Sequence, residues 1–189
     1  MVSTMASPSL SLGAAVRDDR LLGAMFAGEG GWWPEQLRLL DTLDGDIRRH
    51  FWSIGRQSGK DVMVAALAVH NAALRPDLDE VLPKGMWREI LVCCPRQDQA
   101  EDFVATCGAH ITNSPVLSKT AEMRSDRINF KVPRTDRHGR KFTAKVRILA
   151  IPANSHTTRG KRVSLLIFNE YAHADDTAGP AALSICGRL

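Results

Sequence analysis

The pattern of apolar and polar positions along this 189-residue chain predicts helices and strands in alternation. Three segments predict helices. They are residues 32–43, with leucines on one face, residues 60–74, apolar nearly all round, and the amphipathic residues 96–111. Short apolar runs predict strands at residues 49–54, 89–95, 126–132, 141–152 and 164–170. This alternation favours an α/β layered sheet of the P-loop type, mostly parallel, with helices on both faces. The turn-forming residues 133–140 add a local antiparallel pair near 127–150.

The composition predicts one globular domain behind a flexible arm. Residues 1–30 are rich in Ser, Ala and Gly with weak periodicity, so we expect a partly disordered arm and a domain over residues 31–189. The hydrophobic fraction of 44% and the charged fraction of 24% are ordinary for a soluble protein. No apolar run is long enough to span a bilayer, and the N-terminus lacks a signal peptide. The cysteines lack zinc spacing and fit reduced core residues.

One stretch, "SIGRQSGKDVM" at residues 53–63, predicts an anion site. A strand, a Gly-containing loop, a lysine and a helix bring backbone N–H groups and the positive helix end to one place. Lys60 would then reach the terminal phosphates of a nucleotide. The loop departs from the pattern G-x-x-x-x-G-K-[ST], because Ile54 holds its first Gly position and Asp61 its Ser/Thr position. A loop that carries Gly and Lys by chance is the alternative. The candidate nucleotide-binding residues are Gly55, Arg56, Gln57, Ser58, Gly59, Lys60 and Asp61.

A second strand end supplies the complementary chemistry. The apolar strand at 164–170 ends in Asn169-Glu170, where phosphate-hydrolysing sites carry two acidic residues. The first carboxylate supports Mg²⁺ and the second orients the attacking water. Glu170 can fill the second role, whereas Asn169 lacks the charge for the first. We therefore hypothesise a carboxylate swap, in which Asp61 approaches the metal and Asn169 makes a neutral hydrogen bond behind it. A decayed site that binds weakly is the competing interpretation.

Three motifs together resemble the large terminase subunit of tailed bacteriophages, which packages DNA into proheads. They are "GRQSGK" before an apolar helix, "TTRG" at residues 157–160, and "LLIFNEYAH". The resemblance covers roughly residues 33–176 and implies ATP and Mg²⁺ as cofactors. It further implies double-stranded DNA, a portal protein and a small terminase subunit as partners, with a ring of subunits in the full motor. The place of action would be the cytoplasm of the bacterial host, and transiently the prohead. We expect no nuclease domain in a chain of this length, so residues 31–189 would be an ATPase domain that is incomplete at its C-terminus. The chain would be either a piece of a larger subunit or a small stand-alone relative.

The resemblance also assigns roles to single residues. It implies that Gly59 and Lys60 bind phosphates and that Arg56 sits near the γ-phosphate. Glu170 would be the catalytic glutamate. Arg159 would reach the nucleotide of a neighbouring subunit, its alternatives being a turn residue or a DNA contact. Gln36 would contact adenine, its alternative being a solvent-facing helix residue.

The segment from Arg124 to Arg162 is strongly basic, with only Asp126 and Asp136 as acids. Such a segment can bind polyanions, and the candidate DNA contacts are Arg134, Arg137, Arg140 and Lys141. A solvated hairpin with charged faces is the alternative. Two rival functions stay open. One is a non-catalytic nucleic-acid-binding module with a vestigial nucleotide site, and the other is a different P-loop translocase, although complete helicase motifs are missing.

Overall fold

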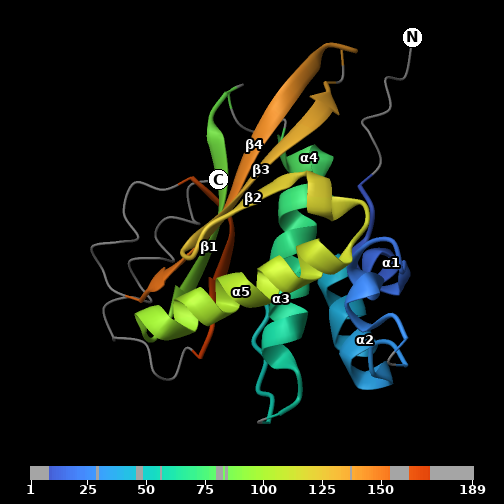
Figure 1. Ribbon diagram of the computed structural model, residues 1–189, viewed down its shortest axis with the longest axis vertical. Coiled ribbons are helices and arrows are strands. Elements are labelled where there is room, and N and C mark those ends of the chain that lie inside the picture. Colours follow the sequence, from blue (N-terminus) through green and yellow to red (C-terminus); the bar gives the residue numbers. More distant parts are fainter. Residues whose placement is uncertain are drawn as a thin grey trace.

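The computed structural model describes residues 9–28, 30–45, 49–55, 57–79, 83, 85–136, 138–153 and 162–170. Its centre is a five-stranded sheet with helices packed against it (Figure 1). The strands, in chain order, are β1 (Trp87–Cys94), β2 (Ala121–Met123), β3 (Arg127–Thr135), β4 (Lys141–Pro152) and β5 (Val163–Phe168). In space their order is β2-β3-β4-β1-β5. The predicted α/β class is confirmed.

The sheet is mixed rather than mostly parallel. β1 runs parallel to both β4 and β5, whereas β3 runs antiparallel to β2 and to β4. The local antiparallel pair predicted near 127–150 is therefore confirmed. Its turn is stabilised by Asp136, whose Oδ1 accepts hydrogen bonds from the backbone N–H groups of His138 and Arg140 at 2.9 Å each. This is the turn chemistry that the sequence indicates.

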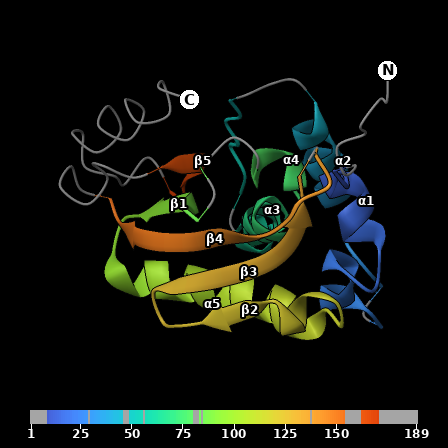
Figure 2. The same ribbon diagram turned by 90° about the horizontal axis from the view of Figure 1, so that it is seen from above.

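Two long helices, α3 (Lys60–Ala73) and α5 (Gln97–Asn113), pack on the same face of the sheet (Figure 2). The even-numbered side chains of β3 and β4, such as Phe130 and Ile148, meet them in one large core cluster. The helices predicted on the other face of the sheet are not found within the described ranges. In those ranges that face carries a smaller apolar cluster around Leu91 and Leu149. The shorter helices are α2 (Pro34–Asp41), α4 (Pro76–Asp79) and the 3-10 turns η2 (Thr42–Asp44) and η3 (Leu117–Lys119). No helix in the described ranges is long and apolar enough to cross a bilayer.

The predicted N-terminal arm is wrong for residues 9–28. They form α1 (Leu12–Arg17) and the 3-10 turn η1 (Leu22–Phe26), whose Leu12 and Leu22 belong to the core. The carboxylate of Asp44 accepts the backbone N–H groups of Leu12 and Gly13 at 2.6 and 2.8 Å. Ser114 donates to the carbonyl of Arg20 at 2.8 Å. The weak local periodicity of this segment hid its folding, because its buried face is completed by partners that lie far away in the sequence.

The predicted strand at residues 49–54 is also wrong. Residues 51–55 are not assigned to a strand, although their exposure alternates as in a strand. Trp52 and Ile54 pack against the core, while Phe51 is 90% exposed. A strand needs a neighbour for its backbone hydrogen bonds. Among the described residues, β5 is the edge of the sheet and no strand lies beyond it to pair with this segment.

A buried histidine joins the two long helices and makes stability depend on pH. His110 of α5 is fully buried, and its Nε2 donates to the carbonyl of Val62 in α3 at 3.0 Å. Its ring stacks on Trp32, with 5.8 Å between ring centroids. Burial lowers the pKa of His110 to about 4.

The lowered pKa predicts acid destabilisation between about pH 6.5 and 4. In this window the unfolded chain binds a proton at His110 that the folded chain does not, so the free energy of unfolding falls as pH falls. From about pH 7 to about pH 5 the loss from His110 is about 2 kcal/mol. Urea unfolding at both pH values measures it. The His110→Asn variant should lose this part of the pH dependence, whereas His138→Asn, on an exposed turn, should keep it; equal slopes in all three proteins contradict the assignment.

Candidate nucleotide site

The loop before α3 has the backbone of an anion-binding turn. Gln57 and Gly59 both have left-handed backbone, with φ of +62° and +73°. Gly59 is the N-cap of α3, and its carbonyl accepts from the N–H of Met63 at 3.1 Å. The N–H groups of Lys60, Asp61 and Val62 therefore have no partner within the helix. These donors, added to the positive end of the helix, favour an anion at this place.

Gln36 supports this loop from α2. Its side chain is buried, its Oε1 accepts from the backbone N–H of Trp33 at 3.0 Å, and its Nε2 donates to the carbonyl of Ser58 at 3.0 Å. A Cβ atom at Gly59 would lie 2.5 Å from that Nε2 and would displace it, and the φ of +73° at Gly59 is one that other residues adopt only with strain. Gln36 is therefore not a solvent-facing helix residue. Its predicted contact with adenine stays a prediction, because its amide is engaged by Trp33 and Ser58 in this structure.

Lys60 and Glu170 meet across the site. Lys60 Nζ lies 3.0 Å from Glu170 Oε1, and both side chains are about one-third exposed, at 32% and 33%. The other carboxylate oxygen of Glu170 accepts from Gln99 Nε2 at 3.3 Å. Glu170 has a left-handed backbone conformation, with φ of +60°. Residues other than glycine adopt this conformation at an energetic cost. The structure thus brings together the loop lysine and the strand-end glutamate that the sequence singled out separately.

The proposed metal ligands lie at the same edge of the sheet. Asp61 is exposed in the first turn of α3, and the backbone N–H of Asn169 donates to the carbonyl of Cys93 at 2.9 Å. Burial, together with the negative charges of Asp61 and Glu170, raises the pKa of the Cys94 thiol to about 12. Both carboxylates are therefore near the end of β1.

These residues fit a magnesium ion that arrives with the nucleotide. Within the described ranges, no three His, Cys, Asp or Glu side chains form a metal-binding group. Mg²⁺ is usually bound by one or two carboxylates and by substrate phosphates, not by a cage made of protein alone. The exposed carboxylate of Asp61, one residue after Lys60, matches that donor set.

Gln99 is the site residue that sequence reasoning missed. It lies in the first turn of α5, directly after β1, and its Oε1 is buried with no hydrogen-bond partner in the described part of the chain. The signal was available in "PRQDQ", residues 95–99, which follows a strand end at the same edge as the loop and Glu170. Ligands of such sheets bind at the carboxyl ends of parallel strands.

Several predicted residues lie elsewhere or outside the described ranges. Arg56, Arg137 and Arg159 are outside. Arg134 does not face solvent freely: it donates to Asp79 at 2.8 Å and to the carbonyl of Ala73 at 2.7 Å. Arg140 pairs with Asp136 at 3.0 Å, whereas Lys141 is exposed. Arg134 thus has a structural role at the end of α3 that a solvated hairpin does not explain.

The comparisons with known proteins concern the fold. The sequence matches no protein-family model and no curated protein. The structure is similar to an arginine-to-alanine variant of the large terminase ATPase domain of the Thermus phage P74-26, with a TM-score of 0.55 and 18% sequence identity. The similarity covers 80% of this chain and 60% of that one. The fold of this chain therefore resembles that of a terminase ATPase domain.

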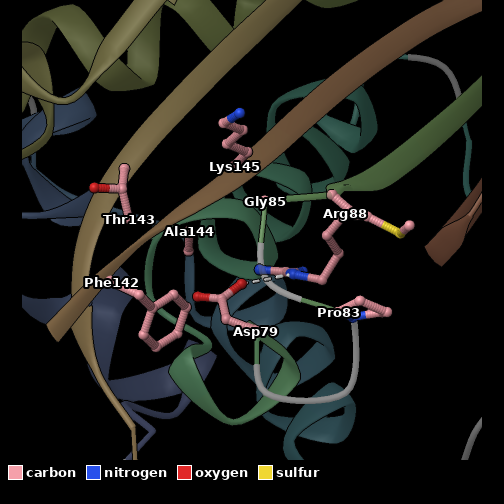
Figure 3. Close-up of a pocket in the computed structure, with 9 residues that line it drawn as sticks. Asp79, Pro83, Gly85, Arg88, Phe142, Thr143, Ala144 and Lys145 are labelled. Atoms are coloured by element: carbon pink, nitrogen blue, oxygen red, sulfur yellow. Dashed lines mark hydrogen bonds and ion pairs between the residues drawn. The ribbon is translucent and has the colours of Figure 1, made fainter. Parts of the chain in front are cut away.

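The terminase-type fold also contains a small cavity at the opposite end of α3, which Figure 3 shows. Its volume is about 20 Å³, enough for one water molecule. The buried side chains of Asp79 and Arg88 face it, with Arg88 Nε donating to Asp79 at 2.8 Å. The other guanidinium nitrogens of Arg88 donate to Asn71, Ser164 and the carbonyl of Ala72. Because Arg88 is already saturated with acceptors, this cavity is not a second anion site.

Proposed function

We propose that this chain is the ATPase module of a DNA-packaging motor, which binds Mg²⁺·ATP on the Gly55–Asp61 loop and hydrolyses it. The observation that carries the proposal is the 3.0 Å contact between Lys60 and Glu170, which are 110 residues apart in sequence. The terminase-type fold supports it. Hydrolysis would drive double-stranded DNA into a prohead, with the module in a ring that contacts a portal protein and a small terminase subunit.

Lys60 has two competing partners in this mechanism. Its ion pair with Glu170 is partly exposed, and such pairs are worth about 0–1 kcal/mol. A charge-assisted hydrogen bond to phosphate is worth about 1.5–3 kcal/mol, so an arriving nucleotide takes Lys60 over. Glu170 would then lose Lys60 and could accept a proton from water, while Gln99 can still hold its other oxygen. The contact of Lys60 with Glu170 and its proposed contact with phosphate are therefore alternatives for the same lysine.

A metal ion would offset the electrostatic repulsion between Asp61 and a bound phosphate. A carboxylate about 4 Å from a phosphate oxygen is repelled by about 4 kcal/mol at an effective dielectric constant of about 20. Mg²⁺ bound with the nucleotide would supply a positive charge that offsets this repulsion. Asp61 would hold the ion, and Asn169 would hydrogen-bond behind it. In the same proposal Arg56 contacts the γ-phosphate, Arg159 reaches a neighbouring subunit's nucleotide, and Gln36 contacts adenine.

Calorimetric titration of ATP tests the proposal. With Mg²⁺ present, Lys60→Ala should weaken ATP binding by about 10- to 150-fold, which corresponds to the loss of one charge-assisted contact. Lys119→Ala removes an exposed lysine elsewhere and should leave the affinity unchanged. Binding by the unmodified chain should also weaken strongly when EDTA removes the metal.

The outcomes separate the parts of the proposal. Equal affinity with Mg²⁺ and with EDTA would rule out the role of Asp61 at the metal, yet leave the loop as the nucleotide site. Equal affinity of the chain and of Lys60→Ala would remove Lys60 from the site. Undetectable binding by the unmodified chain would favour the vestigial site, and with it the non-catalytic nucleic-acid-binding module.

A further inference from the structure

The face of the sheet opposite α3 and α5 carries three lysines that form no ion pair within the described ranges, although the charge of Lys131 is felt by Glu122, which is paired with Arg124. Odd-numbered residues of β3 and β4 point to this face, because their even-numbered neighbours enter the core. Figure 3 shows Lys145 pointing away from the Asp79–Arg88 pair on the other side of β4. We define the lysine face as the odd-numbered residues Lys131, Pro133, Thr135, Lys141, Thr143 and Lys145.

The three lysines give this face a net positive charge. The neighbouring charges on it are neutralised in pairs: Arg147 with Glu89 at 3.5 Å, Arg124 with Glu122 at 2.9 Å, and Arg127 with Asp126 at 2.6 Å. No ion pair within the described ranges involves Lys131, Lys141 or Lys145. Their charges are therefore available to a partner.

Two of these lysines are placed against each other by the strand register. Lys131 lies directly opposite Lys145 in the β3–β4 ladder, and Thr135 lies opposite Lys141 at the end of the same ribbon. Like charges in directly opposite positions destabilise a sheet. An anion that bridges the two lysines removes this repulsion. The arrangement therefore favours a bound polyanion over a merely solvated surface.

We propose that the lysine face binds the phosphate backbone of a nucleic acid. Lysines act as point charges on phosphates without reading bases, so the binding should be independent of sequence. Lys141 and Lys145 are separated by about 13 Å along β4, which is close to the rise of four nucleotides in one strand of a duplex. The end of the β3–β4 ribbon projects past α3 and α5, so a long rigid duplex can approach it (Figure 1).

A protein partner fits this face less well. Protein interfaces centre on apolar and aromatic side chains and are depleted of lysine. The nearest aromatic residue in the register, Trp87, is covered by the guanidinium of Arg147, 4.5 Å from its ring centroid. Of the four contacts predicted from sequence, the lysine face includes Lys141, whereas Arg134 and Arg140 are paired with Asp79 and Asp136. The choice of duplex DNA as the polyanion rests on the proposed function. The inference that the lysine face binds phosphate groups does not rest on it.

Fluorescence anisotropy with a labelled DNA duplex of mixed sequence tests the assignment. The test protein is the triple variant Lys131→Gln, Lys141→Gln, Lys145→Gln. The matched control, Arg20→Gln, Arg38→Gln, Lys119→Gln, removes the same charge from exposed positions off this face. At about 100 mM salt the test variant should lose affinity on the order of 10²-fold. Between about 50 and about 200 mM salt, its plot of log affinity against log salt should be shallower by about 2.7.

The control makes the result specific to the surface. It should change the salt slope by less than about 1, and both triple variants should bind Mg²⁺·ATP like the unmodified chain. The test variant should unfold at the same or a higher temperature, because a like-charge pair is removed. Equal losses in test and control variants, or no binding by the unmodified chain, would overturn the inference. Nucleotide binding that fails while DNA binding still depends on the lysine face would sink the proposed function and leave this inference standing.

Discussion

Replacing Glu170 with glutamine is expected to slow ATP hydrolysis by about 10²- to 10⁴-fold without loss of nucleotide binding. Glutamine has nearly the shape of glutamate but no basic oxygen that can accept a proton from water. The measurement is a single-turnover assay with the chain in excess over ATP. This design reports cleavage of bound ATP whether or not product release is slow. Binding is measured in parallel by calorimetry.

The binding half of this prediction follows from the ion pair between Lys60 and Glu170. Lys60 must leave Glu170 before it contacts phosphate, and E170Q removes that ion pair. Its affinity for Mg²⁺·ATP should therefore be equal to or higher than that of the unmodified chain. A role limited to structure would instead weaken binding and hydrolysis together.

Asp98→Asn is the matched control for E170Q. Asp98 is a 65% exposed carboxylate in the first turn of α5, paired with Arg96, at the same edge of the sheet. Its replacement should leave both hydrolysis and binding unchanged. Hydrolysis by E170Q at the rate of the unmodified chain would show that Glu170 is not the catalytic group. Binding without hydrolysis in the unmodified chain would favour the vestigial-site interpretation.

The parts of the fold that sequence predicted are those whose signal is local. The strand β1 and the helices α3 and α5 lie almost where the sequence places them, because each carries a signal within its own segment. The signal is a short apolar run in β1, a long apolar stretch in α3 and an amphipathic pattern in α5. The α1 segment gave no such signal. It folds because Asp44, more than 30 residues away, accepts its first amide groups. A local sequence pattern does not reveal contacts between residues so far apart in the chain.

The residues of the candidate site also fall into those with a local sequence signal, which were found, and those without one, which were missed. The loop lysine and the strand-end glutamate were found because each follows an apolar run and carries distinctive chemistry. Gln99 was missed because a glutamine in a helix has no distinctive chemistry until its neighbour is known. Arg134 was assigned to DNA because charge in a sequence does not reveal its partner. Its partner, Asp79, lies 55 residues away in α4.

The second large expected effect is a loss of stability, and it concerns Asp79. Its side chain is 1% exposed and pairs at 2.8 Å with both Arg88, 3% exposed, and Arg134, 16% exposed. These two arginines also donate to the carbonyls at the C-terminal end of α3, of Asn71 and of Ala73. Burial lowers the pKa of Arg88, and the negative charge of Asp79 opposes that shift. One carboxylate therefore compensates two arginines that hold the end of the helix opposite Lys60.

The Asp79→Ala variant is expected to lose about 3–5 kcal/mol of unfolding free energy, because it leaves a buried arginine without its counter-charge. Urea unfolding at neutral pH measures the loss. Asp77→Ala is the matched control, since Asp77 lies two residues earlier in the same helix and pairs with Arg75 at 2.7 Å. Its side chain is 37% exposed, so its loss should not exceed about 1 kcal/mol.

A double variant separates the missing charge from the missing contact. Asp79→Leu combined with Arg88→Met replaces the ion pair with apolar side chains and should recover part of the stability lost in Asp79→Ala. Recovery would show that the cost comes from an uncompensated buried charge, and that the pair itself contributes little net stability. A loss in Asp79→Ala no larger than that in Asp77→Ala would mean that the arginines find other acceptors. The ion pairs of Asp79 would then not be needed to hold the far end of α3.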